Sequence, residues 1–528
     1  MKTFALNELS RYSIGTYADV IYRNALLHPN KEAFICGQAR VSFSQFNNRV
    51  NRLVHALQSI GLKKGDGIGI LSWNCLESTE VVGAAMKGGF VVSPFNPRLG
   101  TEELRYIVNY SEIKALFIGP EFVSAANDLR PDFKNVNHYV SIEGTAEGML
   151  SYQEWVDEYP DNEPEVLVEE GDPFIIFYTS GTTGVPKGAV YTHRRKLEDT
   201  RTKALLLGFQ PDDKHVMIMP LFHIGGWSYF WTFFYVGASN VIMTQRSYDA
   251  AATLKTLQDE KATDIHIVPT HLVSMLSLAD SAYDLKSVKR IYYAASPMPL
   301  ELLRKGIDRF GPIFAQGYGQ TESGPDITIL PKEFHSVIDK SPEELKILAS
   351  CGQPCPGVHV KIVDENLFEL PPHTVGDIAV RSKSLMEGYW RMPDETAHTV
   401  IDGWVYTGDM AYYDEKGFIY IVDRKKDMII TGGENVYPRE VEEILYRHRA
   451  VLECAVIGVP DDKWVERVHA LIVMKEGQEC TAQEIAAFCK QYLAGYKVPK
   501  SLEFVEDLPK NPQGKILKRE LKERYRKT

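Results

Sequence analysis

The sequence is short of positive charge and of cysteine. Its 528 residues carry 59 Lys and Arg against 70 Asp and Glu, a net charge of −11, and the pI is near 5.8. This acidic balance argues against a general nucleic-acid binder, because such proteins present basic surfaces. The seven cysteines are thinly scattered. An odd, scattered set predicts no disulfide framework and favours a reducing, cytoplasmic compartment.

The sequence also lacks a clear membrane span and a clear metal-ligand cluster. Residues 225–244 are uncharged, but Gly237 and the small and polar residues after it interrupt the run. We predict a buried helix, a turn and a buried strand there, rather than a transmembrane segment. The N-terminus has no long apolar stretch typical of a signal peptide. Cys351, Cys355 and His359 lie close together, but without a fourth ligand they do not favour zinc.

Short apolar strands alternate with helical stretches through most of the chain. Strands are predicted at 65–74, 90–97, 261–271 and 288–296, and a helix at 79–89. This rhythm predicts an α/β fold, with a large N-terminal domain of parallel or mixed sheets covered by helices. In such folds ligands bind at the carboxyl ends of the strands.

The pattern changes near the C-terminal end. Helices are predicted at 437–449 and 481–493, and strands at 450–460 and 467–475. Together they are enough for a small α+β domain, and the charged residues 423–427 suit a linker. We therefore predict an N-terminal domain over 1–423 and a mobile C-terminal domain over 424–528.

The stretch TSGTTGVPKG (179–188) has the composition of a phosphate-binding loop. Its glycines permit backbone conformations closed to other residues, its hydroxyls can donate to phosphate, and Lys187 supplies a cation. A Walker A loop would carry Ser or Thr after the lysine, where Gly188 stands. The alternative is a flexible surface turn. The candidate phosphate-binding residues are Thr179, Ser180, Gly181, Thr182, Thr183, Gly184 and Lys187.

A second motif, GYGQTESG (317–324), suits a nucleotide and its metal. Glu322 is a candidate Mg²⁺ ligand, because Mg²⁺ prefers oxygen ligands and is held by one or two carboxylates plus substrate phosphates. Thr321 could bond a phosphate oxygen. Gly317 and Gly319 would let a flat ring approach the backbone.

Two later motifs carry a carboxylate and a lysine. In YTGD (406–409), Asp409 could accept hydrogen bonds from ribose hydroxyls, and an Asx turn is the alternative. In PKNPQGKILKREL (509–521), Lys515 stands on a turn before a basic helix. The alternative for that helix is a solvated face.

These motifs together resemble the adenylate-forming superfamily, which includes acyl-CoA synthetases, adenylation domains of peptide synthetases and firefly luciferase. YTSGTTGVPKG, YGQTE, YTGD, DRKKDMIITGGENVYPREVE and PQGKILKREL occur in consistent order. The resemblance covers nearly the whole chain, from about Thr16 to about Lys522. It implies that the protein makes an acyl-adenylate from a carboxylate and ATP, after which a thiol displaces AMP.

The resemblance implies a role for each matching residue around ATP. Residues 179–187 would hold the β- and γ-phosphates, Glu322 would ligate Mg²⁺, and Thr321 would contact the α-phosphate. Asp409 and Arg424 would bind the ribose. The residues implied at the adenine are Ala295, Ser296 and Pro297 on one side and Gly317, Tyr318 and Gly319 on the other.

The resemblance also assigns the catalytic lysine and the hinge. Lys515 would bridge the attacking carboxylate oxygen and the α-phosphate during adenylation. The small domain would then rotate about Lys426 and present residues 431–438. Gly432 and Gly433, followed by Glu434, would leave room for the pantetheine arm of CoA, and a plain hairpin turn is the alternative. Val465 stands where relatives often have Gly.

The sequence indicates the class of acid substrate but not the specific acid. His223 matches the family's aromatic gate, and the Asp that follows this position in amino-acid-activating domains is missing. Acetate-specific relatives place Trp where Gly319 stands, so a medium-chain, branched, cyclic or aromatic acid is implied. The candidate acyl-pocket residues are Trp227, Tyr229, Tyr293, Gly319, Gly324 and Pro325. Core packing is the alternative for Trp227 and Tyr229.

The sequence therefore predicts an AMP-forming acyl-CoA ligase that uses ATP, Mg²⁺ and coenzyme A. One alternative is a stand-alone adenylating enzyme that loads a carrier protein. Another is a binder of nucleotides or acyl-adenylates without catalysis, which the intact Lys515, Glu322 and Asp409 disfavour. The specific acid, the direction of the reaction in the cell and any homo-oligomer stay open.

Overall fold

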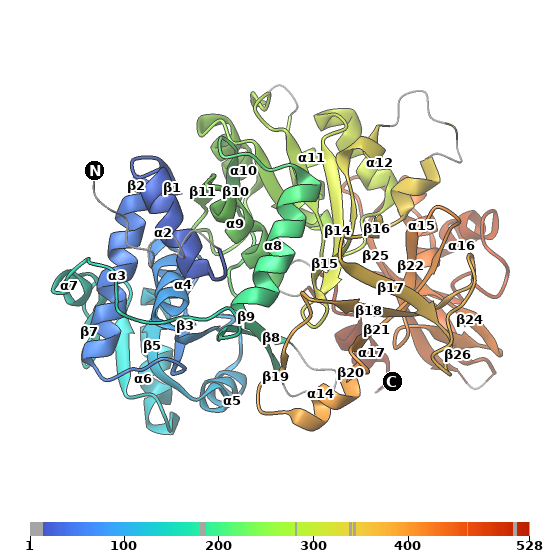
Figure 1. Cartoon of the computed structure of the whole chain (residues 1–528). Coiled ribbons are helices and arrows are strands. Elements are labelled where there is room, and N and C mark those ends of the chain that lie inside the picture. The colour runs from blue at the N-terminus through green and yellow to red at the C-terminus, as the bar shows by residue number, and fades with distance from the viewer. Residues whose placement is uncertain are drawn as a thin grey trace.

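The computed structural model describes residues 14–179, 186–279, 282–336, 341, 345–461, 463–510 and 515–526 (Figure 1). Two large mixed sheets, one smaller antiparallel sheet and one C-terminal sheet make up its strands. The first three sheets belong to the N-terminal part of the chain, and the last hundred or so residues form the fourth. The predicted α/β architecture with a smaller C-terminal α+β part is confirmed.

The first large sheet has nine strands, parallel in its centre and antiparallel at both edges. In spatial order they are β16 (Gln353–Pro354), β15 (Gly324–Leu330), β14 (Phe314–Gln320), β13 (Arg290–Tyr293), β12 (Asp264–Ile267), β10 (Lys214–Met217), β11 (Ser239–Ile242), β1 (Glu32–Cys36) and β2 (Ala39–Ser42).

The second large sheet has eight strands with the same mixed character. In spatial order they are β19 (Gly388–Tyr389), β9 (Lys187–Thr192), β8 (Pro173–Thr179), β4 (Val91–Pro94), β3 (Gly67–Leu71), β5 (Ile113–Ile118), β6 (His138–Ser141) and β7 (Leu150–Ser151). The expected strands at 65–74, 90–97, 261–271 and 288–296 are confirmed as β3, β4, β12 and β13.

Two five-stranded sheets follow. The third comprises β17 (Val358–Val363), β18 (Gly376–Ser382), β20 (Val400–Ile401), β21 (Trp404–Tyr413) and β22 (Ile419–Arg424). The fourth comprises β23 (Ile429–Thr431), β24 (Glu434–Val436), β25 (Val451–Asp461), β26 (Val465–Met474) and β27 (Ser501–Phe504). Residues 425–428 join them, and the boundary after residue 423 stays a prediction.

Helices cover the sheets. They are α2 (Tyr17–Leu27), α3 (Phe43–Ser59), α4 (Leu76–Gly88), α5 (Thr101–Ser111), α6 (Val123–Leu129), α7 (Tyr152–Asp157), α8 (His193–Leu207), α9 (Ile224–Val236), α10 (Ala250–Asp259), α11 (Pro269–Leu276), α12 (Leu300–Phe310), α14 (Pro393–Thr399), α15 (Pro438–Arg447), α16 (Ala482–Lys490) and α17 (Lys518–Arg526). The predicted helices at 79–89, 437–449 and 481–493 correspond to α4, α15 and α16.

Helix α9 explains the uncharged run at 225–244. It is apolar all round because it lies between the two large sheets: Trp227 packs on Phe177 of β8, and Phe230 stacks on Phe34 of β1. Gly237 ends the helix in the left-handed region at φ +78°, and strand β11 follows. The predicted buried helix, turn and strand are confirmed. Within the described part of the chain, no helix is long and apolar enough to cross a membrane.

Candidate active site

The β14–β15 hairpin delivers Thr321 and Glu322 to the carboxyl edge of the nine-stranded sheet. Gln320 pairs with Gly324 across the turn, and the Gln320 N–H donates to the Ser323 hydroxyl at 3.1 Å. The Tyr191 hydroxyl donates to the Thr321 carbonyl at 2.6 Å, which ties the turn to strand β9 of the other large sheet. The hairpin is thereby fixed between the two sheets.

The two glycines of this motif are required by the protein's own packing. A Cβ on Gly317 would lie 1.6 Å from the Tyr292 hydroxyl oxygen, and one on Gly319 would lie 2.4 Å from the Gly324 carbonyl oxygen. No side chain fits at either place, whatever ligand approaches the backbone. The steric reason for Gly317 is therefore the neighbouring strand β13, and that for Gly319 is the hairpin itself. The roles of both glycines toward adenine and the acyl group stay predictions.

Strands β8 and β9 hold the two ends of the phosphate-loop motif together. Thr179 ends β8, Lys187 begins β9, and the two are register partners in an antiparallel pair. The predicted residues Ser180, Gly181, Thr182, Thr183 and Gly184 lie outside the described residues. What the structure places is the base of the loop, with Lys187 at its exit.

Tyr389 connects Lys187 to Glu322. Its hydroxyl donates to the Glu322 Oε1 atom at 2.9 Å, and the Lys187 Nζ atom lies 5.3 Å from the centre of its ring. Lys187 also forms an ion pair with Glu395 of α14. Strand β19 puts Tyr389 there by pairing with β9, so two motifs more than a hundred residues apart meet at one ring. Sequence reasoning missed Tyr389, which lies in the aromatic stretch before α14, and Glu395, which lies in the first turn of α14.

Asp409 lies at the centre of a buried hydrogen-bond cluster. Its Oδ2 atom accepts from the Tyr318 hydroxyl and from the Gln320 side-chain amide, both at 2.7 Å. Its Oδ1 atom lies 3.1 Å from the Arg424 Nε atom, across the β21–β22 pair. The structure thus joins Tyr318, Asp409 and Arg424, three of the predicted nucleotide residues. Gln320 belongs to the same cluster and was missed.

Lys515 is brought from the C-terminal part of the chain to this cluster. Burial and the neighbouring Arg424 cation lower the pKa of Lys515 to about 8, against the opposing effect of Asp409 and Asp427. Lys426, the predicted hinge residue, also contributes to this lowering. An exposed lysine would keep its ordinary pKa. The lowered pKa of Lys515 beside the ribose-binding candidates therefore marks it as a candidate functional residue.

His223 faces the same charge from the N-terminus of α9. Burial and then the Lys515 cation lower the pKa of His223 to about 4. Its Nδ1 atom accepts the Gly225 N–H at 3.1 Å, which leaves the proton on Nε2 of the neutral ring. His223 and Lys515, nearly three hundred residues apart, therefore lie on the same site.

The AASP turn is strained and contains an unsatisfied hydroxyl. Ala295 adopts φ +67°, a conformation that costs an alanine of order 1–3 kcal/mol. The buried Ser296 hydroxyl has no hydrogen-bond partner among the described residues. Both features follow directly after β13, where the sequence places the adenine, and Pro297 continues the same turn.

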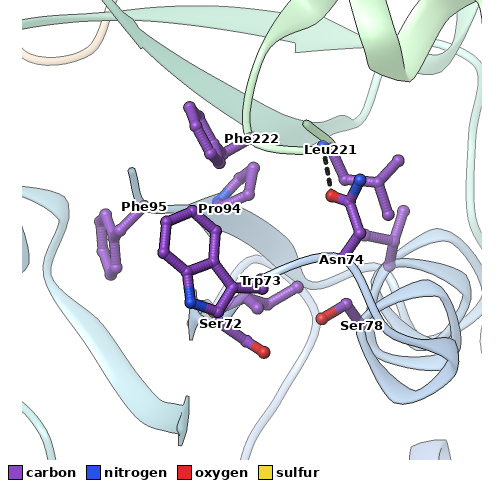
Figure 2. A pocket seen from close by; sticks show the side chains of 10 residues that line it. Ser72, Trp73, Asn74, Ser78, Pro94, Phe95, Leu221 and Phe222 are labelled. Carbon is purple, nitrogen blue, oxygen red and sulfur yellow. Dashed lines mark hydrogen bonds between the residues drawn. The ribbon is translucent and has the colours of Figure 1, made fainter. Parts of the chain in front are cut away.

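A pocket lies beside His223 at the carboxyl ends of β3 and β4 (Figure 2). It is lined by Ile70, Ser72, Trp73, Asn74, Ser78, Val82, Pro94, Phe95, Leu221 and Phe222. Asn74 braces one wall: its Oδ1 atom accepts the Leu221 N–H at 2.9 Å, and its Nδ2 atom donates to the Met219 carbonyl at 3.0 Å. The loop that carries His223 is therefore fixed against the second large sheet.

The predicted acyl-pocket aromatics are fully buried. Trp227, Tyr229 and Tyr293 each have no exposed surface. Trp227 packs against Tyr17 and Phe177, in the manner of a core residue. Gly324 adopts φ +90° and, with Pro325, continues the hairpin. Their contact with an acyl group stays a prediction.

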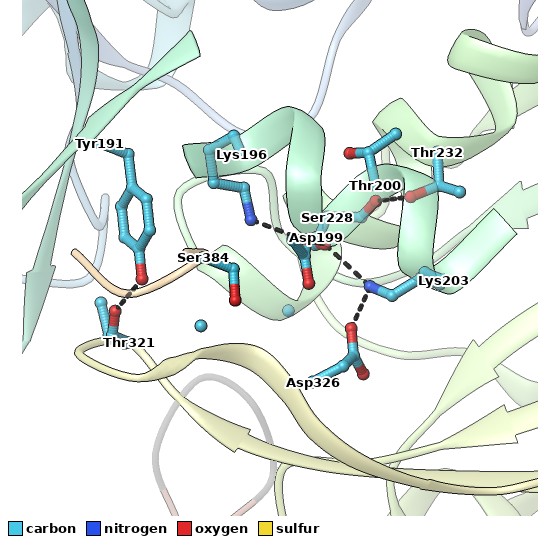
Figure 3. A network of polar contacts seen from close by, with 12 residues as sticks. Tyr191, Lys196, Asp199, Thr200, Lys203, Ser228, Thr232, Thr321, Asp326 and Ser384 are labelled. Atoms are coloured by element: carbon cyan, nitrogen blue, oxygen red, sulfur yellow. Dashed lines mark hydrogen bonds and ion pairs between the residues drawn. The ribbon is translucent and has the colours of Figure 1, made fainter. Parts of the chain in front are cut away.

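A charged network lies buried between α8, α9 and β15 (Figure 3). The Lys196 Nζ atom donates to Asp199 at 3.0 Å, the Lys203 Nζ atom donates to the Ser228 hydroxyl at 2.8 Å, and the Ser228 hydroxyl donates to Asp199 at 2.5 Å. Lys203 also pairs with Asp326 at 2.5 Å, so two cations balance two carboxylates. This network was not predictable from local pattern, because its members come from three separate segments.

Gly432 and Gly433 form the two-residue turn of the β23–β24 hairpin. Thr431 pairs with Glu434, and the glycines between them have φ of +61° and +87°. Two positive φ values in succession are typical of a type I′ turn, which accounts for the glycine pair by itself. Its use as a CoA passage stays a prediction.

The residues present fit a Mg²⁺ ion held partly by substrate. Within the described ranges, no three His, Cys, Asp or Glu side chains gather into a set that could hold a metal alone. Glu322 offers a carboxylate positioned by Tyr389, whose ring also contacts Lys187 at the base of the phosphate loop. One carboxylate with substrate phosphates is the usual protein environment of Mg²⁺.

Comparison with known proteins gives two family models. The model of the AMP-binding enzyme matches residues 21–390, and that of the AMP-binding enzyme C-terminal domain matches 440–515. The chain is 33% identical to a fatty acid–[acyl-carrier-protein] ligase, ScoC of Streptomyces coeruleorubidus, over 98% of both chains. It is 33% identical to a medium/long-chain-fatty-acid–CoA ligase, FadD8 of Mycobacterium tuberculosis, over 94% of this chain and 88% of that one. The crystal structure of the anthranilate CoA ligase AuaEII with anthranoyl-AMP superposes with a TM-score of 0.89, at 28% identity and 97% coverage of both chains.

Proposed function

The chain belongs to the AMP-binding enzyme family and is an acid–thiol ligase, and we propose that it is an AMP-forming acyl-CoA ligase. The reaction converts a carboxylic acid, ATP and CoA into acyl-CoA, AMP and pyrophosphate. The observation that carries this proposal is the meeting of Lys515, Asp409 with Arg424, and His223 at one site.

In the first half-reaction, a carboxylate oxygen attacks the α-phosphorus of ATP and pyrophosphate leaves. Lys515 supplies the cation that stabilises the charge on the carboxylate and the α-phosphate, and Thr321 contacts the same phosphate. Asp409 and Arg424 hold the ribose, since their side chains are already oriented by each other and by Tyr318. Removing an electrostatic group such as Lys515 typically costs about 10²–10³ in rate.

The departing pyrophosphate is held by the loop over 179–187, with Lys187 as its cation. A bound Mg²⁺, held by Glu322 and the phosphates, would supply charge neutralisation there. Tyr389 positions the Glu322 carboxylate, and Glu395 orients Lys187. The adenine is placed between the 295–297 turn and the Gly317–Gly319 backbone.

In the second half-reaction, the CoA sulfur attacks the acyl carbon, the thiol proton is lost and AMP leaves. We propose that residues from 424 onward move as one domain about Lys426, withdrawing Lys515 and presenting the Gly432–Gly433 turn and Glu434. The connection over 425–428 between two separate sheets supports this hinge position.

We propose a medium-chain, branched, cyclic or aromatic acid as substrate. The similarity to a fatty-acid–CoA ligase and to an anthranilate CoA ligase supports both the aliphatic and the aromatic choice. The acyl pocket would be formed by the candidate wall residues Trp227, Tyr229, Tyr293, Gly324 and Pro325. Seven unpaired cysteines support a cytoplasmic enzyme.

A carrier-protein ligase is the second candidate function, because ScoC acts on an acyl-carrier protein and aligns along the whole chain. Both candidates share the adenylation step and differ only in the thiol.

The test is a panel of straight-chain, cyclic and aromatic acids assayed for AMP release with CoA or with a phosphopantetheinyl carrier. We expect AMP release that depends on CoA, and the carrier function is preferred if only the carrier consumes the adenylate. Lys515→Ala should lose adenylate formation and keep thioester formation from supplied acyl-adenylate. Equal loss in both half-reactions would contradict the role of Lys515, and no carboxylate-dependent ATP–pyrophosphate exchange in the intact protein would contradict the proposed function.

A further inference from the structure

His266 is a buried histidine whose ring is unsatisfied on both sides. It is 1% exposed, and neither Nδ1 nor Nε2 has a hydrogen-bond partner among the residues that the structure describes. Three other buried histidines in the described residues (His193, His215 and His469) leave one nitrogen unsatisfied, but the other nitrogen of each is hydrogen-bonded. Buried polar groups are nearly always paired in native structures, so an imidazole with two unpaired nitrogens requires an explanation.

The position of His266 points toward the acyl side of the site. It stands near the carboxyl end of β12, in register with Tyr292 of β13, where ligands of parallel sheets bind. A Cβ placed on Gly225 would lie 3.3 Å from the His223 Nδ1 atom and 3.7 Å from the His266 Cε1 atom. The two imidazoles therefore approach the same point, the first turn of α9.

The glycine between them is less tightly packed than the glycine that follows it. A Cβ on the adjacent Gly226 would lie 2.6 Å from the Pro220 carbonyl oxygen, so that glycine is sterically required. A Cβ on Gly225 would be in tight contact with the His223 Nδ1 atom at 3.3 Å, which a shift of a few tenths of an ångström would relieve, and the φ of Gly225 is not positive. The missing side chain at Gly225 leaves the face between His223 and His266 clear.

The surroundings of His266 are polar but balanced in charge. Its ring lies 5.0 Å from the Tyr292 ring and 5.5 Å from the Tyr229 ring. The Tyr292 hydroxyl donates to Asp326, whose charge is paired with Lys203. Burial and the Lys203 cation hold the pKa of His266 well below its usual range, so the ring is neutral. A neutral imidazole offers one donor and one acceptor, which suits an uncharged oxygen group better than a second carboxylate.

We propose that His266 reads a hydroxyl or carbonyl oxygen on the acyl part of the substrate, a few atoms from its carboxyl carbon. This inference rests on the proposed function and narrows its substrate class to oxygenated acids. His223 stands at the carboxylate end, and His266 recognises the substituent beyond it. A ligand that bonds the imidazole removes the penalty of an unpaired buried group, which corresponds to about a ten- to hundredfold preference over the deoxygenated acid.

The test compares matched acids on the full-length protein with Mg-ATP and CoA. Octanoate is paired with its hydroxy and oxo derivatives, cyclohexanecarboxylate with its ring ketones, and benzoate with its hydroxybenzoates. In each pair kcat/KM for AMP release is measured. We expect at least one oxygenated acid to be preferred about ten- to hundredfold.

Variants then assign the preference to one side chain. His266→Phe keeps a ring of similar size and should bring the ratio close to one while the deoxygenated acid is still used. His266→Asn keeps a donor and an acceptor and should retain part of the preference. His215→Phe is the matched control, since His215 is a buried imidazole on β10 that also contacts Tyr229 but lies two residues deeper in the sheet. It should leave the ratio unchanged, and thermal unfolding checks that each variant folds.

The possible results distinguish failure of the proposed role of His266 from failure of the proposed ligase function. If the deoxygenated acids are turned over and no pair shows a preference for the oxygenated acid, the proposed role of His266 is wrong, and an ordered water is then its partner. The proposed ligase function would stand in that case. A preference that survives His266→Phe also overturns the role of His266. If no acid gives thiol-dependent AMP release, the proposed function fails and this inference fails with it. If His266→Phe does not fold, wild-type ratios close to one still overturn the role of His266. A wild-type preference is then assigned with His266→Asn, and an undiminished ratio in that variant overturns the role.

Discussion

The lowered pKa of Lys515 predicts that adenylation weakens at alkaline pH. Burial and the Arg424 cation lower this pKa from 10.5 to about 8. The shift corresponds to about 3 kcal/mol of destabilisation of the charged amine. The cation is the active form in the proposed mechanism, so activity is full below the pKa and falls as pH rises through it.

The size of the effect follows from the titration. With a pKa of about 8, roughly 90% of Lys515 is charged at pH 7 and roughly 10% at pH 9. The adenylation kcat/KM should therefore fall about ninefold between these two values, whereas an ordinary lysine would stay charged. Bound ATP adds negative charge near the amine, so the break in kcat should lie at a higher pH than the break in kcat/KM.

The assay is pyrophosphate release in the first half-reaction, measured from pH 6 to 10 without CoA. Lys515→Arg retains its charge throughout this range and should remove the break, even if its activity is lower. Arg424→Gln removes the cation that lowers the pKa and should move the break upward, together with a rise in KM for ATP. A break at or above pH 10 in the wild type, or an unchanged break in Lys515→Arg, would refute the reasoning.

Three further predictions concern residues around the site. Tyr389→Phe removes the hydrogen bond to Glu322 and should raise the KM for Mg-ATP about tenfold or more, since bonds to charged groups are worth about 1.5–3 kcal/mol; an unchanged Mg²⁺ titration would exclude the positioning role. Gly317→Ala forces a Cβ against Tyr292 and should lower the urea midpoint by the equivalent of about 1–3 kcal/mol, whereas Gly171→Ala, with open space around it, should not. Val465 is a β-branched residue held at φ +71°, so Val465→Gly should relieve strain and raise the melting temperature of the C-terminal part. Val465→Asn should have an intermediate melting temperature. A lower melting temperature in Val465→Gly would show that the conformation is not strained.

The sequence predicted the elements whose pattern is local. The strand and helix rhythm along 65–97 follows from apolar runs and glycines, and β3, α4 and β4 confirm it. Helix α9 was also predictable, because Gly237 marks its end within an uncharged run. The phosphate loop, the hairpin at Thr321 and Glu322, and the YTGD motif, which lies within β21, were recognisable because each keeps its chemistry within a few consecutive residues.

The partners of these motifs were not predictable from local pattern. Tyr389 reaches Glu322 because β19 pairs with β9, and Gln320 reaches Asp409 because β21 lies beside the β14–β15 hairpin. Such contacts depend on strand order, which no single segment encodes. The steric requirement for Gly317 was missed for the same reason: the atom that forbids a side chain there belongs to Tyr292, on the neighbouring strand.

The buried Lys–Asp network and His266 lie side by side, yet they tolerate change differently. Removing one member of the network, such as Lys203, would strand the Asp326 charge in a buried place, which typically costs about 3–5 kcal/mol. His266 is neutral and unpaired, so replacing it by an apolar ring strands no charge. Buried ion pairs are weak stabilisers compared with apolar packing. The role of this network is better explained by the elements that it connects: helix α9, which begins beside His223, and strand β15, which follows Thr321 and Glu322 in the hairpin. If the proposed role of His266 holds, we expect substitutions at His266 to change acyl specificity with a smaller loss of stability than substitutions within the network.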